Sequence, residues 1–317
     1  MSDKKVGKAD SGSALGGDQA DHTLDQAGLT LGQTVSVLEE LYPLTYAESW
    51  DQPGLIVGDL RWKVRTIYCA VDPTYEVIQD ALMHKADLLI THHPLFFQAV
   101  HTVGGQGFRG DLVRMLIEAH CGLWVGHTNV DVAVRGQGQA FVEKLGLIDQ
   151  GPLEPVDDPE ATSLIGLGRL GRLKETESLE SFAHRVASCL PETEVGITVA
   201  GDKDMPVNLV AVLPGSGDSL IGKAVESGAD VYVTSDLRHH PVTDACQQAR
   251  YAARLSGQDS FPRPAFINTP HSAIEKLWLS VYGIHDIPDA LACKFGEKNR
   301  PDMILTKLVT DPWTWRI

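Results

Sequence analysis

Short apolar runs alternate with amphipathic segments along most of this chain. The apolar runs at 64–71, 86–91 and 122–127 predict buried strands. Apolar residues spaced three and four apart predict helices at 75–84, 111–120 and 139–145. The same spacing predicts a helix that begins at Leu31 and stops at Pro43. Because strand and helix alternate, we expect a parallel sheet covered by helices.

The second half of the chain repeats this alternation. Strands are expected at 163–173, 195–200, 207–213 and 229–234, helices at 179–190 and 219–227, and an edge strand at 304–310. The acidic, proline-containing stretch 152–161 is the best candidate for a boundary. We therefore predict an α/β protein with two interleaved α/β domains and mainly parallel sheets flanked by helices. Its predicted parts are a disordered tail (1–28), a first half (29–155), a smaller middle unit (156–205) and a second half (206–317).

Two segments of the chain resemble each other. The segment 85–94 (KADLLITHHP) is echoed by 228–241, which begins GADVYVTSD and also ends in His-His-Pro. Such an echo is compatible with two related strand–helix units in pseudo-symmetric positions.

Composition excludes several classes of protein. With 317 residues, 43% of them hydrophobic, the chain can bury a sizeable core. A formal net charge of -15 leaves no basic stripe for a phosphate backbone, so direct binding of nucleic acid is not expected. No apolar run is long enough to cross a membrane. The five cysteines are widely spaced, and residues 1–27 lack the apolar core of a signal peptide, so we predict a cytoplasmic location.

Candidate chemistry follows three of the predicted strands. His92 and His93 end the run 86–91, where a buried strand gives way to a loop, and open α/β sheets place their active sites at such positions. Two further apolar runs end in the same way and supply His127 with Asp131 and His271 with Glu275. Imidazole and carboxylate are the usual ligands of zinc, manganese, iron and nickel.

The spacing within the last two pairs is i and i+4. A helix beginning near Pro270 would put His271 and Glu275 on one face, close enough to share a cation. His127 and Asp131 are expected in a loop, where Asp131 is the better ligand because it brings negative charge.

The number of candidate ligands favours two ions over one. His92, His93, Asp131, His271 and Glu275 exceed the three protein ligands of a mononuclear catalytic zinc. We predict two divalent ions, zinc, manganese, iron or nickel, with Glu275 as the bridge. Such a pair would attract small anionic substrates and lower the pKa of bound water, as hydrolysis requires.

Plainer interpretations remain open for several of these residues. Asp131 would also suit an Asx turn, and His271 with Glu275 would suit a surface pair. His239 and His240 follow a strand but lie beyond its end, which favours contact with substrate over metal ligation. We keep His240 and His127 as candidate proton shuttles. The glycine-rich turns 104–107 and 214–218 match no phosphate-binding fingerprint.

The ordered motifs resemble those of a known family, the YbgI-like proteins with a dinuclear metal centre, also described as GTP cyclohydrolase I type 2 or NGG-interacting-factor-like proteins. The matching pieces lie between Leu31 and Leu279: SWDQPGL (49–55), THHP (91–94), HTNVD (127–131), GDSL (217–220), GAD (228–230), TSD (234–236), and His271 with Glu275.

The resemblance implies an NIF-like two-domain fold, a ring-shaped homohexamer, and metal ligation by residues matching the same five positions. It also implies that His127 lies near the metals. On this basis we expect a dinuclear metal-dependent hydrolase of a nucleotide-like anion, with opening of the GTP ring as the reaction that the family label implies. The alternatives are a non-catalytic metal-binding ring scaffold or regulator with protein partners, and a mononuclear metallohydrolase.

Overall fold

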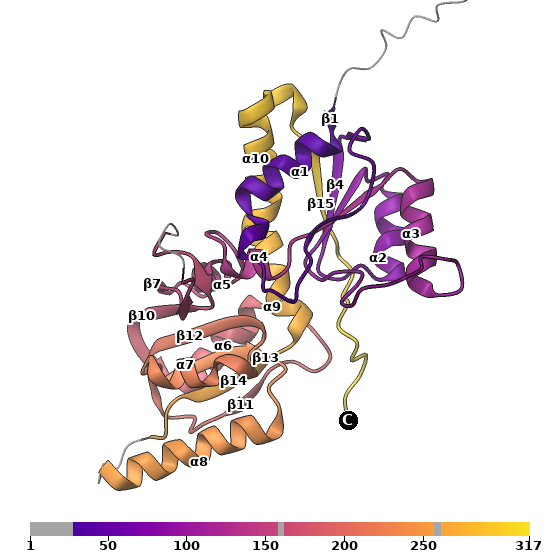
Figure 1. Cartoon of the computed structure of the whole chain (residues 1–317). Coiled ribbons are helices and arrows are strands. Elements are labelled where there is room, and N and C mark those ends of the chain that lie inside the picture. The colour runs from indigo at the N-terminus through magenta and orange to yellow at the C-terminus, as the bar shows by residue number, and fades with distance from the viewer. Residues whose placement is uncertain (1–27, 158–161, 257–260) are drawn as a thin grey trace, which may run out of the picture.

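A five-stranded sheet forms the first of two layered units in the computed structural model, which describes residues 28–157, 162–256 and 261–317 (Figure 1). The expected tail at 1–28 lies outside the described residues except for Gly28. The sheet has the order β15-β4-β5-β6-β2. Its strands are β2 (Gly54–Val57), β4 (Thr66–Ala70), β5 (Leu88–Thr91), β6 (Gly122–Val125) and β15 (Asp302–Leu305). All neighbouring strands are parallel except β2 and β6.

A six-stranded sheet forms the second unit, in the order β11-β14-β13-β12-β10-β7. Its strands are β7 (Ile148–Gly151), β10 (Arg169–Ser178), β11 (Thr198–Ala200), β12 (Pro206–Ser216), β13 (Val231–Ser235) and β14 (Ala265–Thr269). Only β12–β13 and β13–β14 pair in parallel. The expectation of mainly parallel sheets therefore describes the first sheet, whereas the second is mixed because antiparallel strands extend both of its edges.

Helices cover both faces of each sheet. On the first sheet, α2 (Tyr75–Met83) and α3 (Phe108–Glu118) pack on one face, and α1 (Leu31–Leu41) packs on the other. On the second sheet, α5 (Gln137–Lys144) and α6 (Leu179–Cys189) pack on one face and α7 (Ile221–Glu226) and α8 (His239–Ser256) on the other. Small two-stranded ribbons, β1 (Leu29–Thr30) with β3 (Lys63–Val64) and β8 (Glu154–Pro155) with β9 (Gly166–Leu167), complete the strands of the described residues.

Side-chain caps help to explain where the predicted helices begin. The Thr30 hydroxyl accepts a hydrogen bond from the backbone amide of Gln33, and the Thr30 amide donates one to the side-chain oxygen of Gln33, forming a capping box. The side chains of Thr74 and Ser178 cap α2 and α6 by accepting a hydrogen bond from the backbone amide three residues on. The polar residues before these amphipathic segments therefore satisfy amides that would otherwise lack partners.

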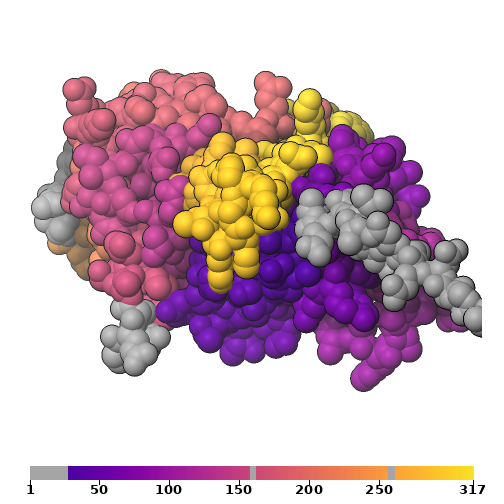
Figure 2. Space-filling model, turned by 90° about the horizontal axis from the view of Figure 1, so that it is seen from above, coloured from indigo at the N-terminus to yellow at the C-terminus, as the bar shows by residue number. Residues whose placement is uncertain are grey.

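One helical rod joins the two sheets. It consists of α9 (His271–Trp278), a π-helical turn (Leu279–Gly283) and α10 (Ile284–Phe295). Ile274 and Leu277 of α9 pack in the core of the second sheet, whereas Ile287 and Leu291 of α10 pack against the first. From above, the yellow C-terminal part of the chain lies between the indigo N-terminal part and the pink middle part (Figure 2). The rod therefore ties the two layered units together.

The internal echo has a structural counterpart. Asp87 precedes β5 and Asp230 precedes β13, and each strand is interior to its sheet. One carboxylate oxygen of each aspartate accepts hydrogen bonds from two consecutive backbone amides at the start of the neighbouring strand: Arg65 and Thr66 at 2.8 and 2.9 Å for Asp87, Asn208 and Leu209 at 2.8 Å each for Asp230. The two segments thus occupy equivalent places in the two sheets.

Three sequence expectations differ from the observed chain path. The predicted strand 304–310 runs instead from Asp302 to Leu305, as an edge strand of the first sheet. The predicted boundary at 155 falls after β7, which already belongs to the second sheet, and β15 returns to the first. The predicted middle unit 156–205 is not separate, because its strands β10 and β11 belong to the second sheet. Strand pairing, and not local composition, determines which sheet a strand joins. Within the described residues, no helix combines the length and apolar character that crossing a bilayer requires.

Candidate metal centre

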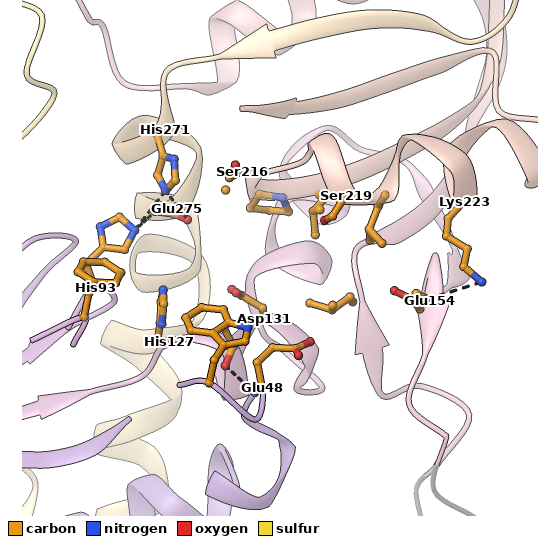
Figure 3. A pocket seen from close by; sticks show the side chains of 18 residues that line it. Glu48, His93, His127, Asp131, Glu154, Ser216, Ser219, Lys223, His271 and Glu275 are labelled. Atoms are coloured by element: carbon orange, nitrogen blue, oxygen red, sulfur yellow. Dashed lines mark hydrogen bonds and ion pairs between the residues drawn. The ribbon is translucent and has the colours of Figure 1, made fainter. Parts of the chain in front are cut away.

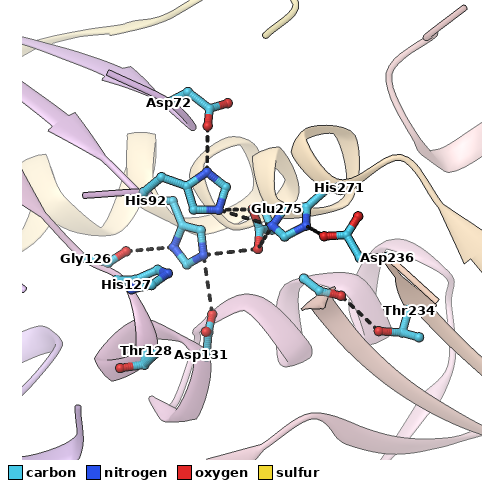
Figure 4. A network of polar contacts seen from close by, with 12 residues as sticks. Asp72, His92, Gly126, His127, Thr128, Asp131, Thr234, Asp236, His271 and Glu275 are labelled. Carbon is cyan, nitrogen blue, oxygen red and sulfur yellow. Dashed lines mark hydrogen bonds and ion pairs between the residues drawn. The ribbon is translucent and has the colours of Figure 1, made fainter. Parts of the chain in front are cut away.

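The carboxyl ends of strands from both sheets meet at one cluster of side chains (Figure 4). From the first sheet, His92 and His93 follow β5 directly, and His127 follows β6 after one glycine. From the second sheet, His271 begins α9 just after β14. Parallel strands place their carboxyl ends at the same edge, so residues distant in sequence converge there.

Glu275 lies at the centre of this cluster and is 3% exposed. Its Oε1 lies 3.0 Å from Nε2 of His271 and 3.3 Å from Nε2 of His92. Its Oε2 lies 2.9 Å from Nε2 of His93. The two oxygens of one carboxylate therefore contact three imidazoles.

Asp131 stands on the other side of His92. Its Oδ1 lies 3.7 Å from Nε2 of His92. Asp131 is not in a loop, as the sequence suggested, but in the short helix α4 (Thr128–Val132). The Asn129 side chain accepts a hydrogen bond from the His127 amide and donates one to the Tyr42 carbonyl, so it holds the start of this helix.

Each of the three central imidazoles is oriented through its Nδ1 atom. Nδ1 of His92 donates to the Gly126 carbonyl at 2.7 Å, Nδ1 of His93 to Asp72 at 2.7 Å, and Nδ1 of His271 to Asp236 at 2.7 Å. With Nδ1 engaged, Nε2 of every ring faces the cluster. Carboxylate and carbonyl partners of this kind fix the tautomer and direction of histidines that bind metals.

Several polar atoms of the cluster have no hydrogen-bond partner among the described residues although they are buried: Nε2 of His92, Oδ1 of Asp131 and Oε2 of Glu275. Buried polar atoms without partners are costly, and a cation that accepts their lone pairs removes that cost. Ligand atoms of His93, His271 and Glu275 lie within 4.8 Å of one another, as do those of His92, His93 and His127. These groups could hold metal ions, and the donor set fits a divalent metal.

The charges of the cluster also favour a bound cation. Burial, followed by the charge of Glu275, raises the pKa of Asp131 to about 8. Burial opposes the charges of His93 and His271, but Glu275 outweighs it and raises their pKa values to about 11 and about 9. Burial also disfavours ionised Glu275, yet the imidazoles of His93 and His92 hold its pKa well below the usual range. Without metal, protons on the imidazoles therefore supply the positive charge that cations would supply.

His127 borders the cluster and carries its own partner. Its Nδ1 donates to Oδ2 of Asp51 at 2.9 Å, and Thr128 donates to the same oxygen at 2.7 Å. Burial opposes the ionisation of Asp51, but these hydrogen bonds outweigh it and lower the pKa of Asp51 to about 2. Asp51 is therefore ionised and fixes the orientation of the His127 ring through its Nδ1.

A cavity of about 640 Å³ opens beside the cluster (Figure 3). His93, His127, Asp131, His271 and Glu275 line it. The sequence did not single out the lining residues Glu48, Phe97, Glu154 and Lys223, because no local pattern marks a residue as facing a cavity formed by distant segments.

The structure does not bring His240 to this site. His240 is exposed in the first turn of α8, stacks edge-on with His239, and lines neither cavity beside the cluster. Asp236 instead follows β13 directly and reaches His271. The sequence interpretation missed the orienting roles of Asp51, Asp72 and Asp236, although Asp51 and Asp236 lie in the motifs SWDQPGL and TSD. For Asp72 the only available signal was its place just after a strand.

Replacement of Asp72 tests the orienting contacts. In Asp72→Ala, the His93 ring loses the acceptor for its Nδ1 proton, so we expect metal affinity to fall about 10- to 100-fold. Competition with a chromophoric chelator measures this change. Asp302→Ala, at an exposed position of β15, is the control. Equal affinities for wild type and Asp72→Ala would contradict the orienting role.

Solved structures share this architecture. The Staphylococcus aureus hypothetical protein SA1388 aligns with a TM-score of 0.76 at 24% identity and covers 91% of this chain and 100% of its own. A Bacillus cereus protein described as related to NIF3 aligns with a TM-score of 0.76 at 23% identity, over 90% of this chain and 99% of its own. At these identities the likeness concerns the fold alone.

Sequence comparison adds the family. A Streptomyces coelicolor protein named GTP cyclohydrolase 1 type 2 homolog is 37% identical over 285 residues, which are 90% of this chain and 93% of that protein. A Clostridium perfringens protein of the same name is 31% identical over 221 residues, 68% of this chain and 80% of its own. The family model described as Duf34/NIF3 (NGG1p interacting factor 3) matches residues 29–289. This chain, with its paired α/β sheets and histidine–carboxylate cluster, therefore belongs to the DUF34/NIF3 family.

Proposed function

We propose that the cluster binds two divalent metal ions and makes the protein a metal-dependent hydrolase of a nucleotide-like anion. The observation that carries this proposal is the set of buried ligand atoms without partners around the central carboxylate of Glu275. His93 and His271, whose Nε2 atoms are 3.2 Å apart, would hold one ion together with Glu275. His92 and Asp131 would hold the second ion, to which Glu275 would also bind. His127 would be an additional ligand of this ion or a proton carrier beside it.

When bound, such a pair of cations would supply a water molecule of lowered pKa and positive charge for the oxygens of the substrate. The protein's own residues then have distinct tasks. Glu275 and Asp131 offset much of the cationic charge in a buried place. His127, oriented by Asp51, would carry a proton between the reacting groups and the solvent-filled cavity.

The name of the Streptomyces coelicolor relative suggests GTP as a first substrate to test, with hydrolytic opening of its guanine ring as the reaction. The proposal also includes a homohexamer, for which the exposed Trp313, Trp315 and Ile317 offer contact surface, and a cytoplasmic location, which the five unpaired cysteines support. Size-exclusion chromatography with light scattering would test the assembly.

Turnover decides between hydrolase and scaffold. Protein loaded with Zn²⁺, Mn²⁺, Fe²⁺ or Ni²⁺ should convert GTP or a phosphoester, and His92→Ala should lower the rate at least about 100-fold because an ion loses one of its ligands. Glu226→Gln, at an exposed position of α7, should leave the rate unchanged. Metal-dependent capture of a protein partner without turnover on a broad panel would favour the scaffold, and about one metal ion per chain would favour a mononuclear site.

A further inference from the structure

The cavity beside the cluster has two chemically different ends. At one end stand the predicted metal ligands His93, His271 and Glu275, and at the other stands Lys223 beside Glu154 (Figure 3). Ser219 lies on the wall between the two ends. A ligand that fills about 640 Å³ would therefore reach well beyond the metal ligands.

The wall that carries the serines is held rigidly. The carbonyl of Gly215 accepts a hydrogen bond from Thr234 at 2.9 Å, and the Gly217 carbonyl accepts one from Tyr232 at 3.0 Å. A Cβ atom on Gly217 would lie 1.9 Å from Oγ1 of Thr234, and one on Gly215 would lie 2.7 Å from Oε1 of Glu275. Only glycine permits this loop to approach both β13 and the bridging carboxylate, so Ser216 is presented at a fixed place beside the cluster.

The polar groups on this wall are available to a ligand. Ser216 and Ser219 are exposed to the cavity, and neither hydroxyl has a hydrogen-bond partner in the part of the chain that the structure describes. Lys223 is the one lysine or arginine among the described lining residues, and its ion pair with Glu154 is loose, at 3.7 Å. The Ser219 hydroxyl and the Lys223 ammonium, on the part of the wall away from the cluster, can each donate hydrogen bonds to phosphate oxygens.

Aromatic rings occupy the wall near the cluster. Trp50 is 62% exposed and Phe97 is 56% exposed, yet both line the cavity. Their centroids lie 5.9 and 5.8 Å from that of His127, and both rings stand edge-on to it. Apolar rings left open to solvent beside a polar cluster offer a surface for a planar group.

We propose that this cavity binds a phosphate-bearing planar ring compound, with the ring against Trp50 and Phe97 and the phosphate at Ser219 and Lys223, away from the metal ligands. This inference rests on the proposed function, because it specifies which end of a nucleotide-like anion faces the metals. The ring end, and not the phosphate, reaches the cluster. Glu48, a carboxylate on the cavity wall, would repel a phosphate placed on that side, whereas at the other end Lys223 offsets the charge of Glu154 (Figure 3).

Binding of guanosine monophosphate and guanosine tests this orientation without requiring turnover. Isothermal titration calorimetry would compare wild type, Lys223→Ala and the control Lys174→Ala, which changes an exposed lysine of β10 outside the cavity. We expect wild type to bind the monophosphate roughly 10- to 100-fold more tightly than the nucleoside, and Lys223→Ala to remove most of this preference. The preference should persist after the metal is stripped with a chelator, and Lys174→Ala should retain it.

The possible outcomes separate this inference from the proposed function. If Lys223→Ala binds the monophosphate over the nucleoside as strongly as wild type does, the inferred phosphate subsite is wrong, whichever group then holds the phosphate. If wild type loses this preference when the metal is removed, the phosphate binds the metals and the inferred orientation is also wrong. Absence of binding by the monophosphate at millimolar concentration would overturn the ligand class. If the protein binds guanosine monophosphate as expected but hydrolyses no substrate, the phosphate subsite stands and only the proposed hydrolase function is contradicted.

Discussion

Glu275→Gln is expected to lower the metal content from about two ions per chain to one or fewer. Glutamine keeps the size of the side chain but removes the negative charge and one strong donor oxygen, and three imidazoles would lose the carboxylate that they share. Because this residue contacts both predicted metal positions, its replacement should lower the affinity of the protein for both ions by at least about 100-fold. Elemental analysis after dialysis against a known concentration of free zinc measures the effect.

The same measurement on Glu226→Gln provides the control, since that glutamate lies exposed on α7 and away from the cavity. Circular dichroism of both variants would establish that the fold is retained. Two ions per chain in Glu275→Gln would show that the central carboxylate is not the bridge, and the assignment of the site would have to be abandoned.

Trp278→Ala should produce the largest loss of stability. Trp278 is completely buried at the end of α9, its Nε1 donates to the Tyr42 hydroxyl at 3.1 Å, and the two rings meet edge to face at 5.3 Å. Its ring is also 6.2 Å from that of His92. Removing it leaves a cavity where the helical rod crosses from one sheet to the other, so the free energy of unfolding should fall by about 3–5 kcal/mol.

Chemical denaturation in the presence of a chelator measures this change without the contribution of bound metal. Met83→Ala is the control, because that side chain is 68% exposed at the end of α2 and its removal should change the free energy of unfolding by less than about 0.5 kcal/mol. A loss below about 1 kcal/mol in Trp278→Ala would mean that the two sheets are held together mainly by other contacts.

Local patterns were sufficient for most helices and strands. The apolar spacing and the caps at Thr30, Thr74 and Ser178 are properties of neighbouring residues, so α1, α2 and α6 were expected within a few positions of their observed ends. The edge strands were less predictable: β7 and β15 pair with strands far away in the chain, and no local signal reports the partner.

The candidate site shows the same division. The histidines just after β5 and β14 were recognisable because the apolar run that precedes them marks the end of a strand. His240 has the same local appearance as His93, yet it starts an exposed helix, whereas Asp236 occupies the place next to the strand end and orients His271. Short sequence similarity between 85–94 and 228–241 therefore preserved the strand but not the role of the histidines.

By itself, the sequence determined the α/β alternation, the family resemblance and the choice of five candidate ligands, because spacing and residue type encode periodicity and ligand chemistry directly. Only the tertiary structure decided that these ligands face one another around Glu275, which aspartates orient them, and which residues line the cavity beyond them. The physical reason is that a binding site depends on distances between segments up to about two hundred residues apart, such as His93 and His271, and such distances arise only when two sheets pack against one helical rod.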